Sequence, residues 1–189
     1  MRSPLAVLFN DLKTVFDQVY SRWYVFGAQA AIMHGAARLT ADVDTTVMYG
    51  GRDLDDLLHA LQANHFSMRT ENTVAFVERT RVLPVVHSIS GIPVDIVFGG
   101  PGLEEEFVRR SSQYDIEGVM VPVASAEDLV VMKILSGRAK DLDDVLAIIT
   151  AQFETFDLPY SRSLLERLES ALNRSDLLPA LDDLVHRVK

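Results

Sequence analysis

Hydrophobic positions in the first half of the chain alternate between helical and strand-like spacing. Apolar residues recur every three or four positions over residues 4–20, which predicts an amphipathic helix. A short apolar run over residues 24–26 predicts a buried strand, and an alanine-rich stretch over residues 28–37 predicts a second helix that closes near Gly35. The alternating, β-branched segment 42–49 predicts another strand, followed by a turn at Gly50 and Gly51 and a helix over residues 53–63.

The pattern then changes to short apolar runs and finally to helices alone. Apolar runs cover residues 74–78, 83–87 and 92–98, with a hairpin signal at Ser90 and Gly91, and they precede a predicted helix at 104–110 and a strand at 119–122. Ser125 and Asp128 have the spacing of a capping box, and further helices are predicted near residues 139–152, 161–172 and 176–187. We therefore expect an α+β fold: a small mixed β-sheet flanked by helices in residues 1–122, and a C-terminal helical bundle in residues 123–189 that packs on this core.

Composition and charge narrow the class of protein. The 189 residues are 48% hydrophobic and 24% charged, as in a packed globular protein. The sequence has no cysteine, which excludes disulfides, a thiolate zinc site and a cysteine nucleophile. The formal charge of −9 is uneven, with 8 basic against 10 acidic residues in 1–100 and 10 against 17 in 101–189, and it disfavours a dedicated nucleic-acid-binding module. No signal peptide or membrane span is recognisable, so we expect a cytoplasmic protein without a membrane partner.

Aspartate pairs supply the strongest candidate chemistry. Asp-x-Asp triplets occur at Asp42/Asp44, Asp53/Asp55 and Asp141/Asp143. The second triplet opens a predicted helix and the third lies inside one, whereas the first falls on a predicted strand, where alternate side chains share a face. With Asp95 from a later strand, Asp42 and Asp44 would form an all-oxygen site suited to Mg²⁺.

Other residues have both a functional and an ordinary interpretation. Gly27 stands at a strand-to-helix turn that can present backbone N–H groups to a phosphate, and Arg38 could hold a triphosphate oxygen, but a strand-end glycine and a surface ion pair remain open. Lys133 falls in an apolar helical run, where a lysine usually extends its ammonium group to solvent. Lys140, Asp141 and Asp144 have the spacing of helix-surface pairs. His34 and His87 are expected to be structural.

The arrangement resembles the nucleotidyltransferase superfamily over residues 20–150. The resemblance is carried by the glycine turn, the R-x-T-x-D-x-D segment from Arg38 to Asp44, and the distant Asp95; Lys133 and the later Lys140-Asp141-x-x-Asp144 are similar to the AbiEii-type, toxin–antitoxin-associated branch. The resemblance implies that Asp42, Asp44 and Asp95 are catalytic metal ligands. It also implies a nucleotide-binding set of Gly27, Ala28, Arg38, Thr40, Lys133, Lys140 and Asp141. Ala28 departs from the family, which usually has a small hydroxyl residue or glycine there.

The implied activity is metal-dependent transfer of a nucleoside monophosphate from an NTP to an acceptor hydroxyl. Mg²⁺ or Mn²⁺ would be the cofactor, the acceptor would be RNA, a protein or a small molecule, and a cognate toxin or antitoxin would be a candidate partner. The alternative is a non-catalytic, antitoxin-like binding or regulatory protein on the same fold, which Ala28 and the acidic C-terminal region favour and the three acids oppose. A nucleotide-sugar transferase is disfavoured, because a second sugar-nucleotide domain is not expected at this length.

Overall fold

The structure is a computed structural model that describes residues 2–19, 22–48, 50 and 54–188. Over these residues the helices are α1 (Pro4–Val19), α2 (Gly27–Met33), α3 (Leu54–Ala63), α4 (Thr73–Thr80), α5 (Leu103–Arg110), α6 (Ala126–Ser136), α7 (Ala139–Ala151), α8 (Leu158–Leu172) and α9 (Leu177–Val188). The strands are β1 (Trp23–Phe26), β2 (Val43–Met48), β3 (Phe66–Met68), β4 (Val82–His87), β5 (Pro93–Gly99), β6 (Ser112–Ile116) and β7 (Val119–Val123). The chain forms two compact units, Met1–Gln29 with Leu39–Ala124 and Ala30–Arg38 with Ser125–Lys189.

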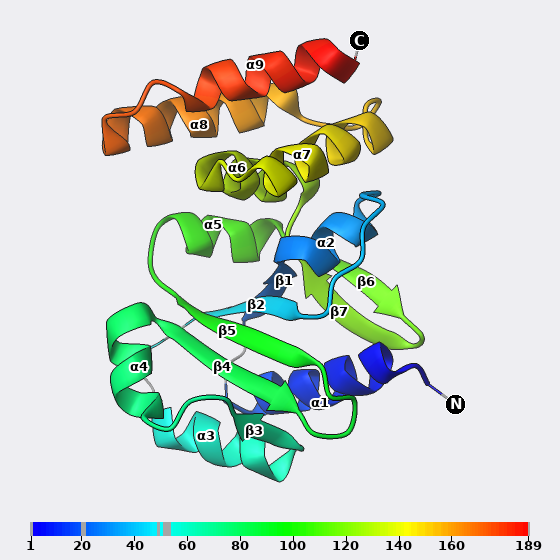
Figure 1. Ribbon diagram of the computed structural model, residues 1–189, viewed down its shortest axis with the longest axis vertical. Helices are drawn as coiled ribbons and strands as arrows, with labels where there is room; N and C mark the ends of the chain where they lie inside the picture. The colour runs from blue at the N-terminus through cyan, green and yellow to red at the C-terminus, as the bar shows by residue number, and fades with distance from the viewer. Residues whose placement is uncertain (1, 20–21, 49, 51–53, 189) are drawn as a thin grey trace. The chain divides into compact units, whose positions relative to one another are not determined.

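The first unit is built on a mixed sheet whose seven described strands have the order β3-β4-β5-β2-β1-β7-β6 (Figure 1). β2 runs parallel to β5, and β1 runs parallel to β7. The other neighbouring strands are antiparallel. The predicted α+β fold with a mixed sheet flanked by helices is therefore confirmed.

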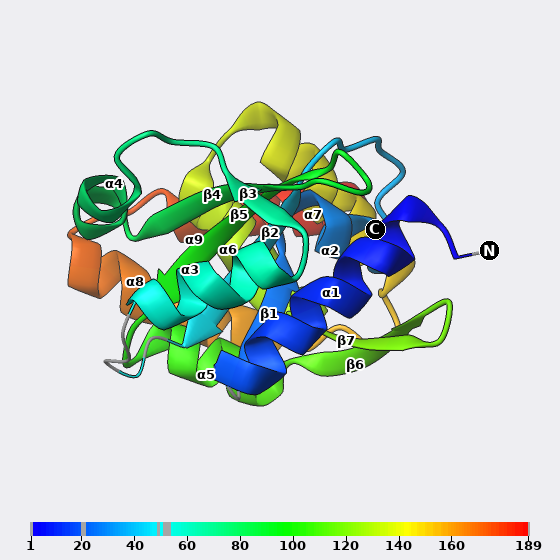
Figure 2. The same ribbon diagram turned by 90° about the horizontal axis from the view of Figure 1, so that it is seen from below.

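The two faces of this sheet differ in polarity. Along β5 the buried Val94 and Ile96 alternate with the half-buried Asp95, and along β2 the buried Val43 and Thr45 flank the half-buried Asp44. α1 and α3 lie against each other and cover one face of the sheet, as both ribbon views show (Figure 2). Because successive side chains in a strand point to opposite faces, the apolar set packs under these helices, and Asp44 and Asp95 share the other face. We call this second side the polar face.

The second unit is helical. α6 contacts α7, α8 and α9, and α9 also contacts α7 and α8. The predicted cap at Ser125 is confirmed, because its Oγ accepts a hydrogen bond from the backbone N–H of Asp128 at 3.1 Å. The segment after α2 also belongs here: a Cβ built on Gly35 would lie 2.5 Å from the Cβ of Ala151 at the end of α7. None of the helices in the described ranges has the length and apolar character needed to cross a membrane.

Most predicted elements are present, and the differences have local causes. The helix predicted over 28–37 ends at Met33, because Gly35 has a φ of +106°, in the region that terminates helices. The apolar run at 74–78, to which no element was assigned from the sequence, forms part of the helix α4, which has no fully buried residue. β3 and β6 were not predicted, since they are short or largely exposed edge strands. The predicted positions at Tyr20, Tyr49, Gly51 and Asp53 lie outside the described residues.

Candidate functional site

The candidate site begins where β1 ends and α2 starts. Gly27 has a φ of +67°, in the left-handed region that favours glycine. A Cβ built on Gly27 would lie 1.9 Å from Oδ2 of Asp44, so the carboxylate occupies the space that a side chain at position 27 would need. A glycine at position 27 therefore makes room for Asp44, and the phosphate contact predicted for Gly27 stays a prediction.

The sheet register places two of the predicted acids side by side. Asp44 on β2 pairs with Asp95 on β5 in parallel register, and with Phe26 on β1 in antiparallel register. Neighbouring strands are about 4.8 Å apart, and register partners project to the same face. The carboxylates of Asp44 and Asp95 therefore belong to adjacent positions of the polar face, directly beside the Gly27 turn.

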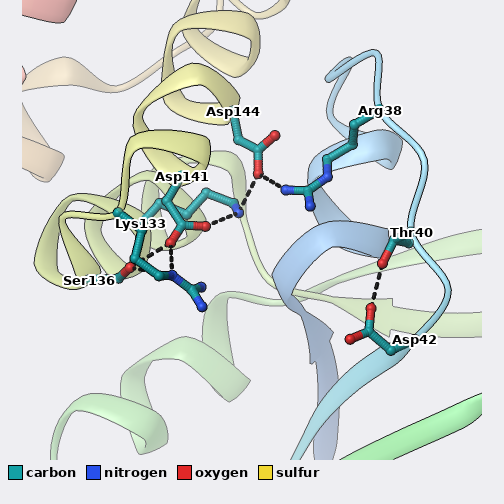
Figure 3. A network of polar contacts seen from close by, with 8 residues as sticks. Arg38, Thr40, Asp42, Lys133, Ser136, Asp141 and Asp144 are labelled. Carbon is teal, nitrogen blue, oxygen red and sulfur yellow. Dashed lines mark hydrogen bonds and ion pairs between the residues drawn. The ribbon is translucent and has the colours of Figure 1, made fainter.

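The third predicted acid, Asp42, lies just outside the strand on which it was predicted. β2 begins at Val43, so Asp42 is one residue before it, and its carboxylate accepts a hydrogen bond from the Thr40 hydroxyl (Figure 3). Such local side-chain bonds compete with regular strand pairing. Asp42 is exposed, as expected for a residue in the loop that leads into β2.

These residues fit a divalent cation that is shared with a nucleotide. Their carboxylates supply the hard oxygen donors that Mg²⁺ prefers. In the described ranges, no three His, Asp or Glu side chains are gathered into a group that could hold a metal by themselves. Mg²⁺ commonly takes one or two protein carboxylates together with waters and substrate phosphates, and Asp44 with Asp95 meets that requirement.

An arginine that sequence reasoning missed contacts Asp95. Nη1 of Arg69 donates to Oδ1 of Asp95 at 2.9 Å, and both side chains are about 40% exposed. Arg69 directly follows the short strand β3, and its backbone N–H donates to the carbonyl of Pro84 at 2.9 Å. No motif marks this arginine. It becomes visible only through the pairing of β3 with β4, and β3 itself was not predicted.

Two of the predicted cationic residues, Arg38 and Lys133, belong to a charge cluster in the second unit (Figure 3). Nζ of Lys133 on α6 donates to Asp144 at 2.7 Å and to Asp141 at 3.2 Å, both on α7. Arg38 also donates to Asp144, whereas Arg138 and the Ser136 hydroxyl donate to Asp141. The side chains of Lys133, Asp141 and Asp144 are 3–7% exposed, so the cluster core is buried.

This environment changes the proton affinity of Asp141. Burial alone would raise its pKa, but hydrogen bonds from Arg138, Ser136 and Lys133 outweigh burial and lower the pKa to about 2. The Asp141 carboxyl therefore stays ionised at any pH near neutrality. Asp141 and Asp144 therefore do not form pairs on the helix surface. They belong to a buried network that joins α6, α7 and the segment after α2.

The remaining predicted nucleotide contacts differ in accessibility. Lys133 does not extend its ammonium group to solvent, because that group lies between two buried carboxylates. Lys140 is exposed on α7, and Ala28 is buried at the start of α2. The nucleotide contacts implied for Lys133, Lys140 and Asp141 stay predictions. Asp42, Asp44 and Asp95 belong to the first unit, and the charge cluster belongs to the second.

A pocket in the first unit lies at the other end of β1. Its lining includes Trp23, Lys13 and Arg22, and Trp23 is the first residue of β1, whereas Gly27 follows its last. Lys13 is paired with Asp17, and Arg22 is paired with Glu105. Both cations of this pocket are therefore ion-paired, and the pocket is separate from the candidate acids.

His87 is structural, as expected. Its side chain is fully buried, with Nδ1 2.8 Å from the Ser90 hydroxyl and Nε2 3.1 Å from the Asp11 carboxylate. These contacts join α1 to the turn between β4 and β5, on the face opposite the candidate acids.

Comparison with known proteins agrees with this architecture. The model of a family described as "Nucleotidyltransferase of unknown function (DUF6036)" matches residues 3–177. The solution structure of the antibiotic-resistance factor ANT(2'')-Ia is similar with a TM-score of 0.62 at 14% identity, covering 92% of this chain and 97% of that one. The crystal structure of ANT(2")-Ia in complex with adenylyl-2"-tobramycin has a TM-score of 0.61 at 12% identity, covering 90% of this chain and 99% of that one. No curated protein sequence matches. At these identities the two structures show a shared fold.

Proposed function

This chain belongs to a family of nucleotidyltransferases of unknown function, and from that premise we propose that it transfers a nucleoside monophosphate from an NTP to an acceptor hydroxyl. The observation that carries the proposal is the Asp44 carboxylate seated against Gly27, with Asp95 beside it in register. In the reaction, the hydroxyl oxygen forms a bond to the α-phosphorus, the bond from that phosphorus to the leaving oxygen breaks, and pyrophosphate and the hydroxyl proton are released.

We assign the residues of the first unit to distinct tasks. Asp44 and Asp95, with Asp42 beside them, would hold Mg²⁺ or Mn²⁺, which neutralises phosphate charge and activates the attacking oxygen when bound. Gly27 would contact a phosphate through its backbone N–H, and the Thr40 hydroxyl orients the Asp42 carboxylate. Catalysis of this kind rests on positioning and charge neutralisation rather than on a covalent intermediate.

The acceptor, the partner and the subfamily remain predictions. ANT(2")-Ia has been seen with an adenylylated aminoglycoside, and this favours a small-molecule acceptor as the first class to test here. RNA and protein acceptors, membership of the AbiEii-type branch and a cognate toxin or antitoxin rest on the sequence resemblance alone.

The test is thermal unfolding with each of ATP, GTP, CTP and UTP in the presence of Mg²⁺. A ligand at about 100 times its dissociation constant stabilises the folded state by about 2.7 kcal/mol. We expect one NTP to raise the Tm of the wild type in a Mg²⁺-dependent manner, and Asp44→Asn to abolish the shift. Asp143→Asn removes the same charge from an exposed position of α7 and is expected to keep the shift. Absence of any shift at millimolar NTP would contradict the proposal and favour the non-catalytic binding protein.

A further inference from the structure

Arg69 ends a row of residues that crosses the polar face of the sheet. Its backbone pairs with Pro84, Pro84 is the register partner of Asp95, and Asp95 is the register partner of Asp44. The order across the strands is therefore Arg69, Pro84, Asp95, Asp44. The Arg69 backbone lies two strand spacings, about 9–10 Å, from that of Asp95, and its side chain spans this distance to reach the carboxylate.

Pro84 lies between Arg69 and Asp95 and does not block the Arg69 side chain from reaching the Asp95 carboxylate. Its compact ring has no polar group that could compete for the guanidinium, and Arg69 passes it to reach Asp95. A guanidinium has five N–H donors in a planar fork that suits a phosphate. Among the contacts of the described residues, the Arg69 side chain uses Nη1 for Asp95. The 40% exposed side chain therefore has donors left for a ligand.

The two ends of the row suit different substrates. At the Asp44 end the row meets Gly27, to which we assigned the approach of the nucleotide phosphates. The attacking hydroxyl must then come from the Asp95 side, where the next polar side chain along the row is Arg69. This step rests on the proposed function.

We infer that Arg69 binds an anionic group of the acceptor, and that the acceptor is a small hydroxyl compound carrying a single phosphate. One guanidinium can donate two parallel N–H···O bonds to one phosphate group, so a single arginine suits a single phosphate. The formal charge of −9 repels polyanions, so a small phosphorylated compound is favoured over the 3′ end of an RNA. A polycationic acceptor would meet Arg69 as a like charge.

The experiment measures binding of defined probes to the full chain in Mg²⁺-containing buffer, without NTP. The probes are ribose 5-phosphate, ribose, a single-stranded RNA dodecamer and tobramycin, each titrated by calorimetry. The variants are Arg69→Gln, Arg69→Lys and Arg109→Gln, the last removing one charge from an exposed position of α5. The Arg69–Asp95 pair is well exposed, so Arg69→Gln is expected to fold with little loss of stability.

We expect ribose 5-phosphate to bind the wild type and Arg109→Gln alike, ribose not to bind, and Arg69→Gln to weaken ribose 5-phosphate binding at least tenfold. Arg69→Lys should bind ribose 5-phosphate more tightly than Arg69→Gln but more weakly than the wild type, because lysine keeps the charge and lacks the planar set of guanidinium donors. Equal affinity of the wild type and Arg69→Gln, or no binding of ribose 5-phosphate at millimolar concentration, would overturn the inference. Tighter, Arg69-dependent binding of the RNA would overturn the small acceptor, and preferential binding of tobramycin would overturn the anionic acceptor.

The two proposals fail in different ways. NTP-dependent stabilisation of the wild type tests the nucleotide end of the site without any acceptor, and it decides the proposed function. Probe binding with the Arg69 variants tests the other end without NTP. A rise in Tm with NTP but no Arg69-dependent binding of a probe would contradict this inference and leave the proposed transferase activity standing. Binding of a probe without any rise in Tm with NTP would contradict the proposed transferase activity.

Discussion

Replacing Gly27 by alanine tests the seating of Asp44 directly. Two penalties are expected, because the residue has a φ of +67° and because a Cβ would lie 1.9 Å from the Asp44 carboxylate oxygen. The left-handed conformation costs an alanine about 1–2 kcal/mol. The overlap forces the carboxylate or the backbone to move, which typically costs a further ~1–3 kcal/mol. We expect Gly27→Ala to lower the free energy of unfolding by about 2–5 kcal/mol.

Gly91 provides a matched control for the first penalty. It has a φ of +71°, and a Cβ built there meets no atom within 4 Å. Gly91→Ala should therefore show the conformational cost of about 1–2 kcal/mol without the overlap. The difference between the two variants, measured by urea unfolding, isolates the contact with Asp44.

A double-mutant cycle identifies the partner of the overlap. Asp44→Ala removes the carboxylate atoms that lie 1.9 and 2.7 Å from the added Cβ, so Gly27→Ala should cost less in that background. Equal destabilisation by Gly27→Ala and Gly91→Ala, or no coupling between positions 27 and 44, would refute the seated carboxylate and with it the geometry on which the proposed function rests.

The second unit yields three further expectations. Lys133→Met should destabilise the protein by about 2–4 kcal/mol in urea unfolding, because it leaves two buried carboxylates short of a donor, whereas Lys140→Met at an exposed position should change stability by less than about 0.5 kcal/mol. Folding lowers the pKa of Asp141 from 3.8 to about 2, so the ionised carboxylate stabilises the folded protein fully above about pH 4, and this stabilisation is lost as the pH falls toward 2. The stabilisation amounts to at most about 2 kcal/mol, because its partner Arg138 is 64% exposed and solvent screens the pair. Asp141→Asn should reduce the loss of unfolding free energy between about pH 4 and pH 2. An unchanged loss would mean that other carboxyl groups cause it. Ser125→Ala should cost about 1 kcal/mol by removing the cap of α6, which thermal unfolding can measure; no change would mean that the bond to Asp128 is not formed in solution.

Periodicity predicted the elements that bury an apolar stripe and missed those that do not. The helices from Ser125 onward carry strong repeats of buried leucine, isoleucine and valine, so their bounds were predicted to within a few residues. The edge strand β6 is mostly exposed and polar, and it is a strand because β7 pairs with it. The local sequence of β6 does not indicate this pairing, and the local sequence of β3 does not indicate its pairing with β4.

In the candidate site too, local sequence patterns identified some residues and missed those that are placed by pairing between distant segments. The spacing of Asp42 and Asp44 and the position of Asp95 could be recognised from the sequence, and the register of β2 and β5 is consistent with that grouping. Arg69 was missed because it meets Asp95 only across two strand pairings. The burial of Lys133 was also missed, because its partners lie eight and eleven residues further along the chain, on another helix.

The path of the chain through the two units limits how the protein can be cut. The bundle takes Ala30–Arg38 from the middle of the N-terminal part, so a gene ending at residue 124 would encode this segment without its partners Asp144 and Ala151. A gene starting at residue 125 would encode four helices that lack it. A cut between residues 124 and 125 would therefore separate this segment from the residues that it contacts in the second unit.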